Sequence, residues 1–439
     1  MRAAHPIEQQ IGIEWYASES DGIGGQLKVN PSDFQVTEIE GIEPKSLDAD
    51  PGAYPHLVVR VQLFGWDTFD FARRLGSELG IHRGAIDWAG TKDKEAVTVQ
   101  LFSIKGVNAN DLPEIQGVEM TPIGRFGRGL TFGDLLGNRF ELQVHEPDSP
   151  DGHASISDEL ERFGDGRLAV PNFFGHQRFG SRRPITHLVG LAILDRDWEG
   201  AVMTYLGRPS EREPEETQEA RAYVESTRDW EGSLDRFPYG LGHERRLLEA
   251  LMGQQCPDQT AYRRALETFP EQLRRLFVHA AQSYLFNRIV SERRGRELPL
   301  TEAVPGDTVC FTTQHDELGQ IPDLDRTQLV TPDRVETVNR HIAGGRALIT
   351  APLVGTDTRL EQTGSDHIVR DVLADVGVAP EDFALPEPYD SRGTRRPILV
   401  YPDMEITEDP LTFSFALPSG AYATVVMREY LKVDPDAMS

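Results

Sequence analysis

One short segment, residues 90–100, carries the residues best suited to chemistry. It reads Gly-Thr-Lys-Asp-Lys-Glu-Ala-Val-Thr-Val-Gln, so Asp93 lies between Lys92 and Lys94. Only six of the 45 basic residues are lysine, which makes this pairing unusual in this chain. An opposite charge within a few ångströms lowers the pKa of a carboxylate and keeps it ionised, as a nucleophile requires. Asp93 is therefore a candidate nucleophile, and the alternative from the residues alone is a solvated charged turn.

The elements around this segment predict that a sheet positions it. The spacing of apolar residues predicts a helix that runs to about Leu79, capped by Asp67 or Thr68 and ended by Gly80. A short strand is expected over 86–89, and the alternation after residue 96 predicts a second strand. Asp93 would then lie in a tight connection between two strands, where a rigid sheet can hold a side chain in place.

Two further strands are expected to lie nearby. Residues 25–40 alternate around a turn at 30–33, which predicts that Lys28 lies on a strand face. Residues 135–144 also alternate, with Phe140 on the apolar side. At the end of the chain a strand over 411–417 precedes a turn, and 421–431 fits either a strand or a helix.

The C-terminal tail predicts a discontinuous domain. Some 40 residues cannot bury a core alone, so the tail must dock on earlier sequence. Residues 146–165 are rich in Asp, Ser, Pro and Gly, which indicates a boundary region with one short helix near 157–163. Pro270 begins a strongly periodic helix in the middle of the chain. We expect a first domain, completed by the tail, with a second domain inserted into it.

The composition predicts a globular protein of two or three domains, adapted to high salt. The 439 residues carry a net charge of −26, and the acidic residues are spread along the chain. A negative protein should repel a polyanion, but molar salt shortens the Debye length to about 3 Å and weakens that objection. Two distant cysteines match no metal or redox spacing, and no apolar run is long enough to span a membrane. We expect a cytoplasmic protein without disulfides.

Several other kinds of site are excluded or left open. The sequence has no glycine-rich phosphate loop and no zinc-binding helix motif, so no metal or nucleotide cofactor is predicted. Arginines interleaved with aromatic residues over 172–183 suit stacking on bases and contact with phosphates. Three clusters lie in the expected inserted domain, and the alternative for each is surface charge. They are Arg178, Arg182 and Arg183; Arg293, Arg294 and Arg296; and Arg392, Arg395 and Arg396.

Seven ordered motifs together resemble the TruD family of tRNA pseudouridine synthases. The run from Ala89 to Gln100 resembles the nucleophile motif of that family, with its aspartate at Asp93. The other six are the segments 27–34, 137–140, 172–180, 279–287, 392–397 and 417–424. They follow the order of the family from residue 25 to 431, and the long insertion resembles the archaeal branch.

The resemblance implies a fold and a domain plan. The fold is α+β, a catalytic domain built on a mostly antiparallel mixed sheet flanked by helices, with a large α/β TRUD domain inserted. The implied boundaries are 1–165 and 396–439 for the two parts of the catalytic domain and 171–395 for the insertion. The implied activity is isomerisation of uridine to pseudouridine in tRNA, typically at position 13, by a cofactor-free monomer with no obligate protein partner.

The resemblance also assigns site residues. Asp93 would act on the sugar, on the base, or by removing a proton from C2′, and the sequence leaves all three open. Lys28 would pair with Asp93, and Phe140 would stack on the flipped uracil. The residues expected to bind substrate are Phe34, Asn138, Lys92, Phe174, Gln177 and Arg178. For Phe140 the alternative is ordinary strand core, Phe34 could simply pack beneath the pocket, and Lys92 could contact the RNA backbone or support its loop.

Two other functions stay open at this point. A non-catalytic RNA-binding relative would keep the scaffold, although it would be expected to lose Asp93 or Lys28 first. A nucleoside glycosidase also attacks C1′, but such enzymes usually place two carboxylates across the bond. Glu95 is near in sequence, yet a strand-edge residue two positions away can point elsewhere.

The charge of −26 generates a prediction about salt. Because molar salt screens repulsion between carboxylates, folding and activity should both require it. Unfolding curves and activity assays over a series of KCl concentrations measure this requirement. Full stability in dilute buffer would contradict the interpretation of the composition.

Overall fold

The computed structural model describes residues 1–92, 94–254, 256–360 and 364–438, and its chain forms two compact units. The β-rich unit consists of Ala17–Val170, Thr312–Pro322 and Val400–Ser439. The helix-rich unit consists of Met1–Tyr16, Pro171–Phe311 and Asp323–Leu399. Both units are therefore built from separate stretches of chain. The roles predicted for the catalytic and inserted domains stay predictions.

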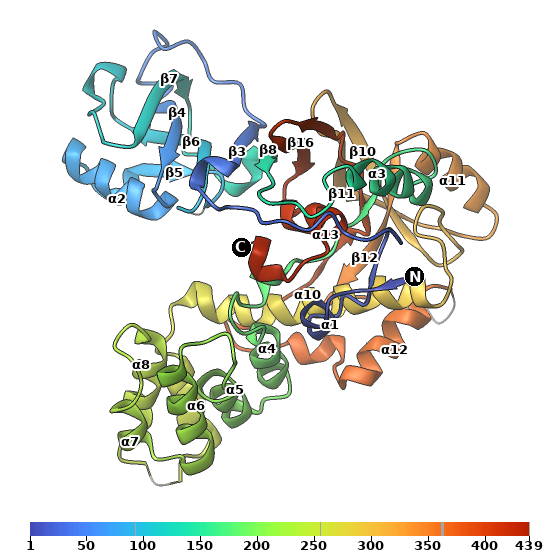
Figure 1. Cartoon of the computed structure of the whole chain (residues 1–439). Coiled ribbons are helices and arrows are strands. Elements are labelled where there is room, and N and C mark those ends of the chain that lie inside the picture. Colours follow the sequence, from blue (N-terminus) through green and yellow to red (C-terminus); the bar gives the residue numbers. More distant parts are fainter. Residues whose placement is uncertain (93, 255, 361–363, 439) are drawn as a thin grey trace. The chain divides into compact units, whose positions relative to one another are not determined.

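The β-rich unit is organised around one mixed sheet (Figure 1). Its strands follow the order β15-β16-β8-β3-β6-β4-β7, with β5 paired to β6. Only β3 and β6 run parallel among the pairs of this sheet, so the sheet is mostly antiparallel. The strands are β3 (Phe34–Glu40), β4 (His56–Phe64), β5 (Ile86–Trp88), β6 (Val97–Lys105), β7 (Val118–Phe126), β8 (Leu135–Gln143), β15 (Glu405–Glu408) and β16 (Leu411–Pro418). The predicted α+β class is confirmed.

Helix α2 (Thr68–Leu79) forms as its sequence predicts. The Asp67 carboxylate accepts hydrogen bonds from the N–H groups of Phe69 and Asp70 at 2.8 and 2.9 Å. At the other end Gly80 adopts a φ of +63°, a left-handed conformation that glycine tolerates best. Both ends of the helix are thus fixed by local chemistry.

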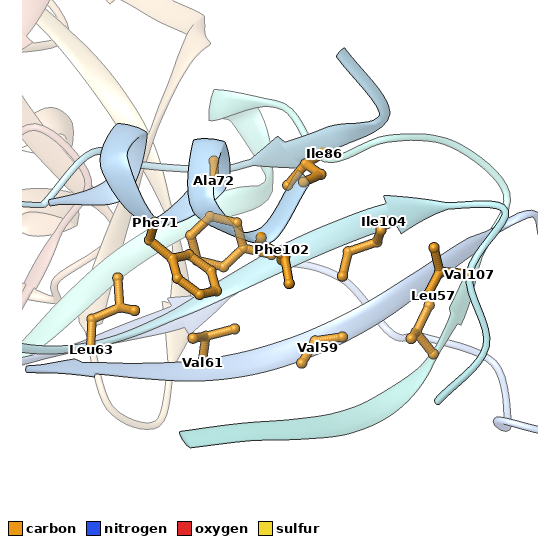
Figure 2. Packing of buried hydrophobic residues seen from close by; sticks show 11 residues of the cluster. Leu57, Val59, Val61, Leu63, Phe71, Ala72, Ile86, Phe102, Ile104 and Val107 are labelled. Atoms are coloured by element: carbon orange, nitrogen blue, oxygen red, sulfur yellow. The ribbon is translucent and has the colours of Figure 1, made fainter. Parts of the chain in front are cut away.

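One face of the sheet packs against α2 (Figure 2). The cluster joins alternate residues of β4 and β6 to the apolar side of the helix, and its rings of Phe71 and Phe102 meet edge to face at 4.8 Å. Its members are Leu57, Val59, Val61, Leu63, Phe71, Ala72, Leu75, Ile86, Phe102, Ile104 and Val107. Burying each large apolar side chain contributes about 1.5–3 kcal/mol, so this cluster holds β4, β6 and α2 as one body.

The tail completes the same unit, as its length required. Strand β16 pairs with β8 from Thr412 opposite Gln143 to Pro418 opposite Gly137. The segment for which strand and helix were both open is helix α13 (Ala423–Leu431), and Phe413 meets its Tyr430 ring at 4.9 Å. Helix α3 (Gly152–Phe163) begins five residues earlier than predicted. Buried Ile156 and Leu160, four residues apart, give that helix an apolar face within a polar segment.

The helix-rich unit contains most of the helices. They are α1 (Pro6–Gln10), α4 (Thr186–Leu194), α5 (Trp198–Leu206), α6 (Glu215–Thr227), α7 (Trp230–Leu234), α8 (Gly242–Leu251), α9 (Gln259–Leu266), α10 (Glu271–Gly295), α11 (Val335–Ala343) and α12 (Asp366–Val376). A four-stranded sheet has the order β11-β10-β12-β13, formed by β10 (Thr308–His315), β11 (Gly319–Leu329), β12 (Ala347–Leu353) and β13 (Thr394–Pro397). Short strands β1 (Arg2–Ala3) and β2 (Trp15–Tyr16) pair, as do β9 (Val170–Pro171) and β14 (Leu399–Val400). No helix of the described residues has the length and apolar character to cross a membrane.

Helices α4 and α10 pack closely enough to enclose a histidine. A Cβ on Gly190 of α4 would lie 2.0 Å from the Phe277 carbonyl oxygen of α10, so only glycine fits there. One turn away the His187 ring stacks on Tyr284 with centroids 4.7 Å apart. Burial lowers the pKa of His187 to about 3, so the ring is neutral in the folded protein.

The buried His187 predicts a defined loss of stability in acid. The unfolded chain protonates this histidine below about pH 6.5, whereas the folded protein does not until about pH 3. The unfolded state therefore binds more protons between these values, and the free energy of unfolding should fall by up to about 1.4 kcal/mol per pH unit as pH decreases. His187→Phe should show a shallower slope in chemical unfolding between about pH 4 and 6.5. The exposed control His367→Phe should not, and equal slopes for the two variants would contradict the assignment.

Candidate active site

The candidate site lies on the face of the β-rich sheet that α2 covers farther along. Val36 of β3 is opposite Thr98 in β6 and opposite Phe140 in β8, while Glu38 is opposite Asn138. Residues directly opposite one another, and residues two apart along a strand, share a face. Phe34, Glu38, Gln100, Asn138 and Phe140 therefore form one surface, on the side that also carries Phe102.

The apolar half of this surface is an aromatic cluster. The rings of Phe34 and Phe140 meet edge to face at 6.4 Å, and Phe140 lies 5.6 Å from Phe415. All three are buried, and Phe140 is 7% exposed. Both roles considered for Phe140, strand core and stacking on a base, remain compatible with this position. The side chain packs as core and leaves only a small part of its ring open to a base. Its substrate role stays a prediction.

Lys28 lies beside this cluster but not on a strand, so that expectation was wrong. Strand β3 begins only at Phe34, after a 3₁₀ turn at Pro31–Asp33 in which the Asp33 carboxylate accepts the Asn30 N–H at 2.5 Å. Lys28 precedes that turn with a φ of +57°. A left-handed lysine costs roughly 1–2 kcal/mol, a cost that proteins concentrate at functional sites. Its ammonium lies 4.6 Å from the centre of the Phe34 ring, within cation–π range.

The polar half of the surface holds the chain immediately before Asp93. The Lys92 ammonium donates to Glu38 Oε1 at 2.6 Å, and the Lys92 N–H donates to Thr68 Oγ1 at 2.8 Å. Thr68 Oγ1 is also 3.2 Å from the side-chain oxygen of Gln100. Lys92 is thus fixed by its main chain to α2 and by its side chain to β3. This arrangement favours the loop-support alternative for Lys92, whereas Asp93 itself lies outside the described residues.

Glu38 is a buried carboxylate that was not among the predicted site residues. Its side chain is 2% exposed, and its second oxygen accepts the Leu101 N–H at 3.1 Å. Burial raises the pKa of Glu38 above its usual value, and the attraction of Lys92 opposes that rise. The sequence pattern that could have identified Glu38 is its alternation with Phe34 and Val36. This pattern places a charged residue on the inward face of the strand.

Asn138 offers an open hydrogen-bond acceptor at the centre of the surface. Its Oδ1 atom is buried and has no hydrogen-bond partner within residues 1–92, 94–254, 256–360 and 364–438. A buried acceptor left unpaired costs about 1–3 kcal/mol, so such an atom is commonly satisfied by water or a ligand. The position suits an N–H donor on a bound base, and the predicted substrate role of Asn138 remains a prediction.

The other predicted substrate residues belong to the helix-rich unit. Phe174 is 6% exposed, with its ring beneath the Arg396 guanidinium at 4.2 Å and edge to face with Phe286. This environment favours a core role over an exposed stacking surface. Gln177 is exposed, and the half-buried Arg178 donates to Ser283 Oγ at 3.3 Å.

Several arginines of the three clusters form hydrogen bonds or ion pairs inside the helix-rich unit. Arg183 donates to the carbonyl oxygens of Gly207 and Tyr205 at 2.7 and 3.0 Å. Arg293 binds both oxygens of Asp307 at 2.6 and 2.8 Å. Arg395 bonds to Thr350, and Arg396 to Asn172. Arg183, Arg293 and Arg396 are buried, so the surface-charge alternative is wrong for them. In all four the planar guanidinium satisfies internal acceptors, which favours a structural role, and RNA contact stays a prediction.

Metal binding receives no support from the described part of the chain. Nowhere among these residues do three or more His, Cys, Asp or Glu side chains gather so that they could hold an ion. The site surface instead offers one buried ion pair, one open acceptor and a cation beside aromatic rings. Such a surface can orient a planar, neutral ring that carries N–H and carbonyl groups.

Comparisons with known proteins agree over the whole chain. The family model described as tRNA pseudouridine synthase D (TruD) matches residues 10–430. Proteins named probable tRNA pseudouridine synthase D from Halobacterium salinarum and Natronomonas pharaonis are 52% and 53% identical, each covering 100% of both chains. A crystal structure of a protein named putative tRNA pseudouridine synthase D (TruD), from Methanosarcina mazei, has a TM-score of 0.82 and 37% identity, covering 99% of this chain and 100% of that one. The acidic, lysine-poor composition fits the two halophilic sources.

The Lys92–Glu38 pair generates a prediction about stability. Glu38→Gln leaves a buried ammonium without its counter-charge, which typically costs about 3–5 kcal/mol. Lys92→Met leaves a buried carboxylate, which should protonate at higher pH. The double variant should lose clearly less free energy of unfolding than the two single variants added together, as measured by chemical unfolding in molar salt.

An exposed ion pair on α2 supplies the control for that cycle. Arg74 and Glu78 pair one turn apart, with side chains 57% and 37% exposed. The matched variants Arg74→Met and Glu78→Gln should each change stability by less than about 1 kcal/mol. Strictly additive losses at Lys92 and Glu38 would show that the buried pair is not coupled.

Proposed function

Because this chain belongs to the tRNA pseudouridine synthase D family, we propose that it isomerises uridine to pseudouridine in tRNA, with position 13 as its target. The observation that carries this proposal is the family match over residues 10–430, together with relatives of matching length. The site surface supports it independently, since an aromatic cluster, a lysine and an open acceptor lie together beside the loop that carries Asp93.

The reaction rearranges bonds without any redox change. The N1–C1′ bond breaks, the uracil rotates while it is held, and C5 bonds to C1′. C5 then loses its proton and N1 gains one, so the product is an isomer of the substrate. An ionised Asp93 serves as nucleophile at the sugar or the base, or removes the C2′ proton. All three routes need a charged carboxylate at a fixed position.

The proposed roles follow from the neighbours of each residue. Lys28 keeps Asp93 ionised. Its ammonium lies over the Phe34 ring, and Phe34 in turn contacts Phe140. A uridine inside an RNA helix must leave the stack before it can react, and Phe140 then supplies an apolar surface for the flipped base. Asn138 accepts a hydrogen bond from an N–H of that base, which favours uracil over a ring without a donor there.

Lys92 acts as a support for the nucleophile loop in this proposal. Its N–H is held by Thr68 and its ammonium by Glu38, so neither group is available as a general acid. Fixing the residue directly before Asp93 restricts the freedom of the carboxylate and lowers the entropy lost on reaching the reactive geometry. Lys92 therefore contributes to catalysis through position.

The glycosidase alternative gains no support from this arrangement. That chemistry requires a second carboxylate that can exchange a proton or activate water. Glu38 is the carboxylate whose position on the site face is established, and its two oxygens are engaged by the Lys92 ammonium and the Leu101 N–H. A carboxylate that is already paired and buried is poorly suited to that role.

Mapping of pseudouridines in tRNA tests the proposal. Cells lacking the gene should lose pseudouridine at one tRNA position, and expression of the wild-type gene should restore it. Asp93→Asn should restore none of it and should release no C5 proton from unmodified tRNA, while its affinity for tRNA stays within about 3-fold, since one amide replaces one carboxylate. The exposed Asp48→Asn is the matched control and should restore the modification in full. Undiminished proton release by Asp93→Asn would exclude the nucleophile assignment.

A further inference from the structure

A second surface on the β-rich unit is built from one arginine and two aromatic rings, and we call it the Arg83 platform (Arg83, Phe69 and Trp88). The guanidinium carbon of Arg83 lies 5.3 Å from the centre of the Phe69 ring and 5.4 Å from that of Trp88. The two rings meet edge to face at 5.3 Å. Arg83 is exposed, and Phe69 is 40% exposed. Phe69 thus presents part of its ring to solvent at the first turn of α2.

The platform is rigidly supported from beneath. Trp88 is the last residue of β5, directly opposite Phe102 in β6, and its ring lies 6.1 Å from Phe102 in the core cluster. Phe69 belongs to α2, whose capping by Asp67 involves the Phe69 N–H itself. Both rings are thus held by the sheet and the helix, and their outer surfaces are presented at little entropic cost.

Arg83 differs in its partners from the other arginines around it. The exposed arginines of α2, Arg73 and Arg74, pair with Asp70 and Glu78. Arg128 and Arg139 pair with Asp134 and Glu317. Arg83 makes no ion pair with a carboxylate among the residues that the structure describes. In a chain of net charge −26, an exposed cation that lies on two aromatic rings and has no carboxylate partner suits a negatively charged ligand.

The platform adjoins the loop of the nucleophile through a short stretch of chain and through one hydrogen bond. Trp88 is the last residue of β5 and precedes Asp93 by five residues. Thr68, the neighbour of Phe69, accepts the N–H of Lys92. A nucleotide next to a uridine bound at Asp93 can therefore reach these rings, since successive nucleotides lie only several ångströms apart.

We propose that the Arg83 platform binds a nucleotide that neighbours the target uridine in the RNA, with its base stacked on the guanidinium and the Phe69 ring and its phosphate close to Arg83. This inference rests on the proposed function, which supplies the RNA. Guanidinium planes and aromatic rings stack on any base, so the platform contributes affinity without reading sequence. Stacking and short-range contacts keep their strength in molar salt, where long-range attraction to phosphates is screened.

A double-mutant cycle, with one change at Arg83 and one change at a base of the RNA, tests the platform. The RNA is an in vitro tRNA transcript in which the wild-type enzyme forms pseudouridine, prepared also with single abasic nucleotides at each position flanking the target. Arg83→Ala should raise KM by about 5- to 100-fold on the intact transcript and leave kcat within about 2-fold, because stacking binds substrate and transition state alike. At one flanking position the abasic transcript should bind wild type and Arg83→Ala equally.

Control variants keep the test decisive. Arg74→Ala removes an exposed, carboxylate-paired arginine from α2 and should leave KM within about 2-fold. Phe69→Leu keeps apolar volume but removes the ring, and it should raise KM while the protein stays folded, because only the ring contacts with Trp88 and Arg83 are lost. It substitutes for Arg83→Ala if that variant unfolds.

Three outcomes decide the proposal. An unchanged KM for Arg83→Ala and Phe69→Leu would overturn it. An increase in KM that persists on every abasic transcript would also overturn it, because the effect would then come from general charge or from the loop. Failure of the wild-type protein to form pseudouridine in any tRNA would refute the proposed function instead, and direct binding of the same transcripts would still test the platform.

Discussion

The buried pair between Lys92 and Glu38 is the interaction on which the arrangement of the candidate site depends. It joins the loop after β5 to strand β3, and the two residues are 54 positions apart in the sequence. Removing two charges from water costs several kcal/mol, and the cost is recovered only when the remaining lone pairs and protons are also satisfied. The Leu101 N–H satisfies the second Glu38 oxygen, and Thr68 fixes the main chain of Lys92. The pair therefore acts as a geometric constraint, and a loop that pairs elsewhere would lose all of these contacts at once.

The parallel alignment of β3 with β6 explains why these distant residues meet. Val36 lies opposite Thr98, so Glu38 and Gln100 come next in register on the same face. A parallel pair needs a long crossover, and here that crossover contains β4, α2 and β5. The strand that carries Glu38 and the loop that carries Lys92 are thus at opposite ends of one crossover. Shifting either strand by one residue would turn every one of these side chains to the other face.

The sequence allowed strong predictions where the local pattern decides the structure. Helix α2 with its Asp67 cap and its Gly80 end, strand β8 and the terminal strand β16 all follow from spacing and capping chemistry. Lys28 was placed wrongly because apolar and polar residues alternate both before and after the turn at 30–33. The alternation does not reveal that strand pairing begins only after that turn. Glu38 was missed because its inward place in the alternation does not reveal its partner, which lies 54 residues away.

The arginine-rich segments show a related limit. Arg183, Arg293, Arg395 and Arg396 look like basic patches in a one-dimensional sequence, yet they cap carbonyl groups and carboxylates inside the helix-rich unit. In a chain with six lysines, arginine carries out internal bonding as well as surface charge. Arg83, which lies outside all three clusters, lies over two aromatic rings and makes no ion pair with a carboxylate among the described residues. The groups that each arginine contacts distinguish an internal structural role from a surface role. The amino-acid composition alone does not distinguish them.

The pairing of β16 with β8 has a consequence for the order in which the sheet can form. Phe415 completes the aromatic cluster around Phe140, yet most of the helix-rich unit lies between these two residues in the chain. Contacts between segments so distant in sequence form slowly, because the entropy of closing the loop is lost before the contacts are gained. One edge of β8 can pair with β3, which is much nearer in sequence, whereas its other edge waits for β16. The cluster around Phe140 is therefore expected to close late in folding, after the segments on either side of the long crossing have come together.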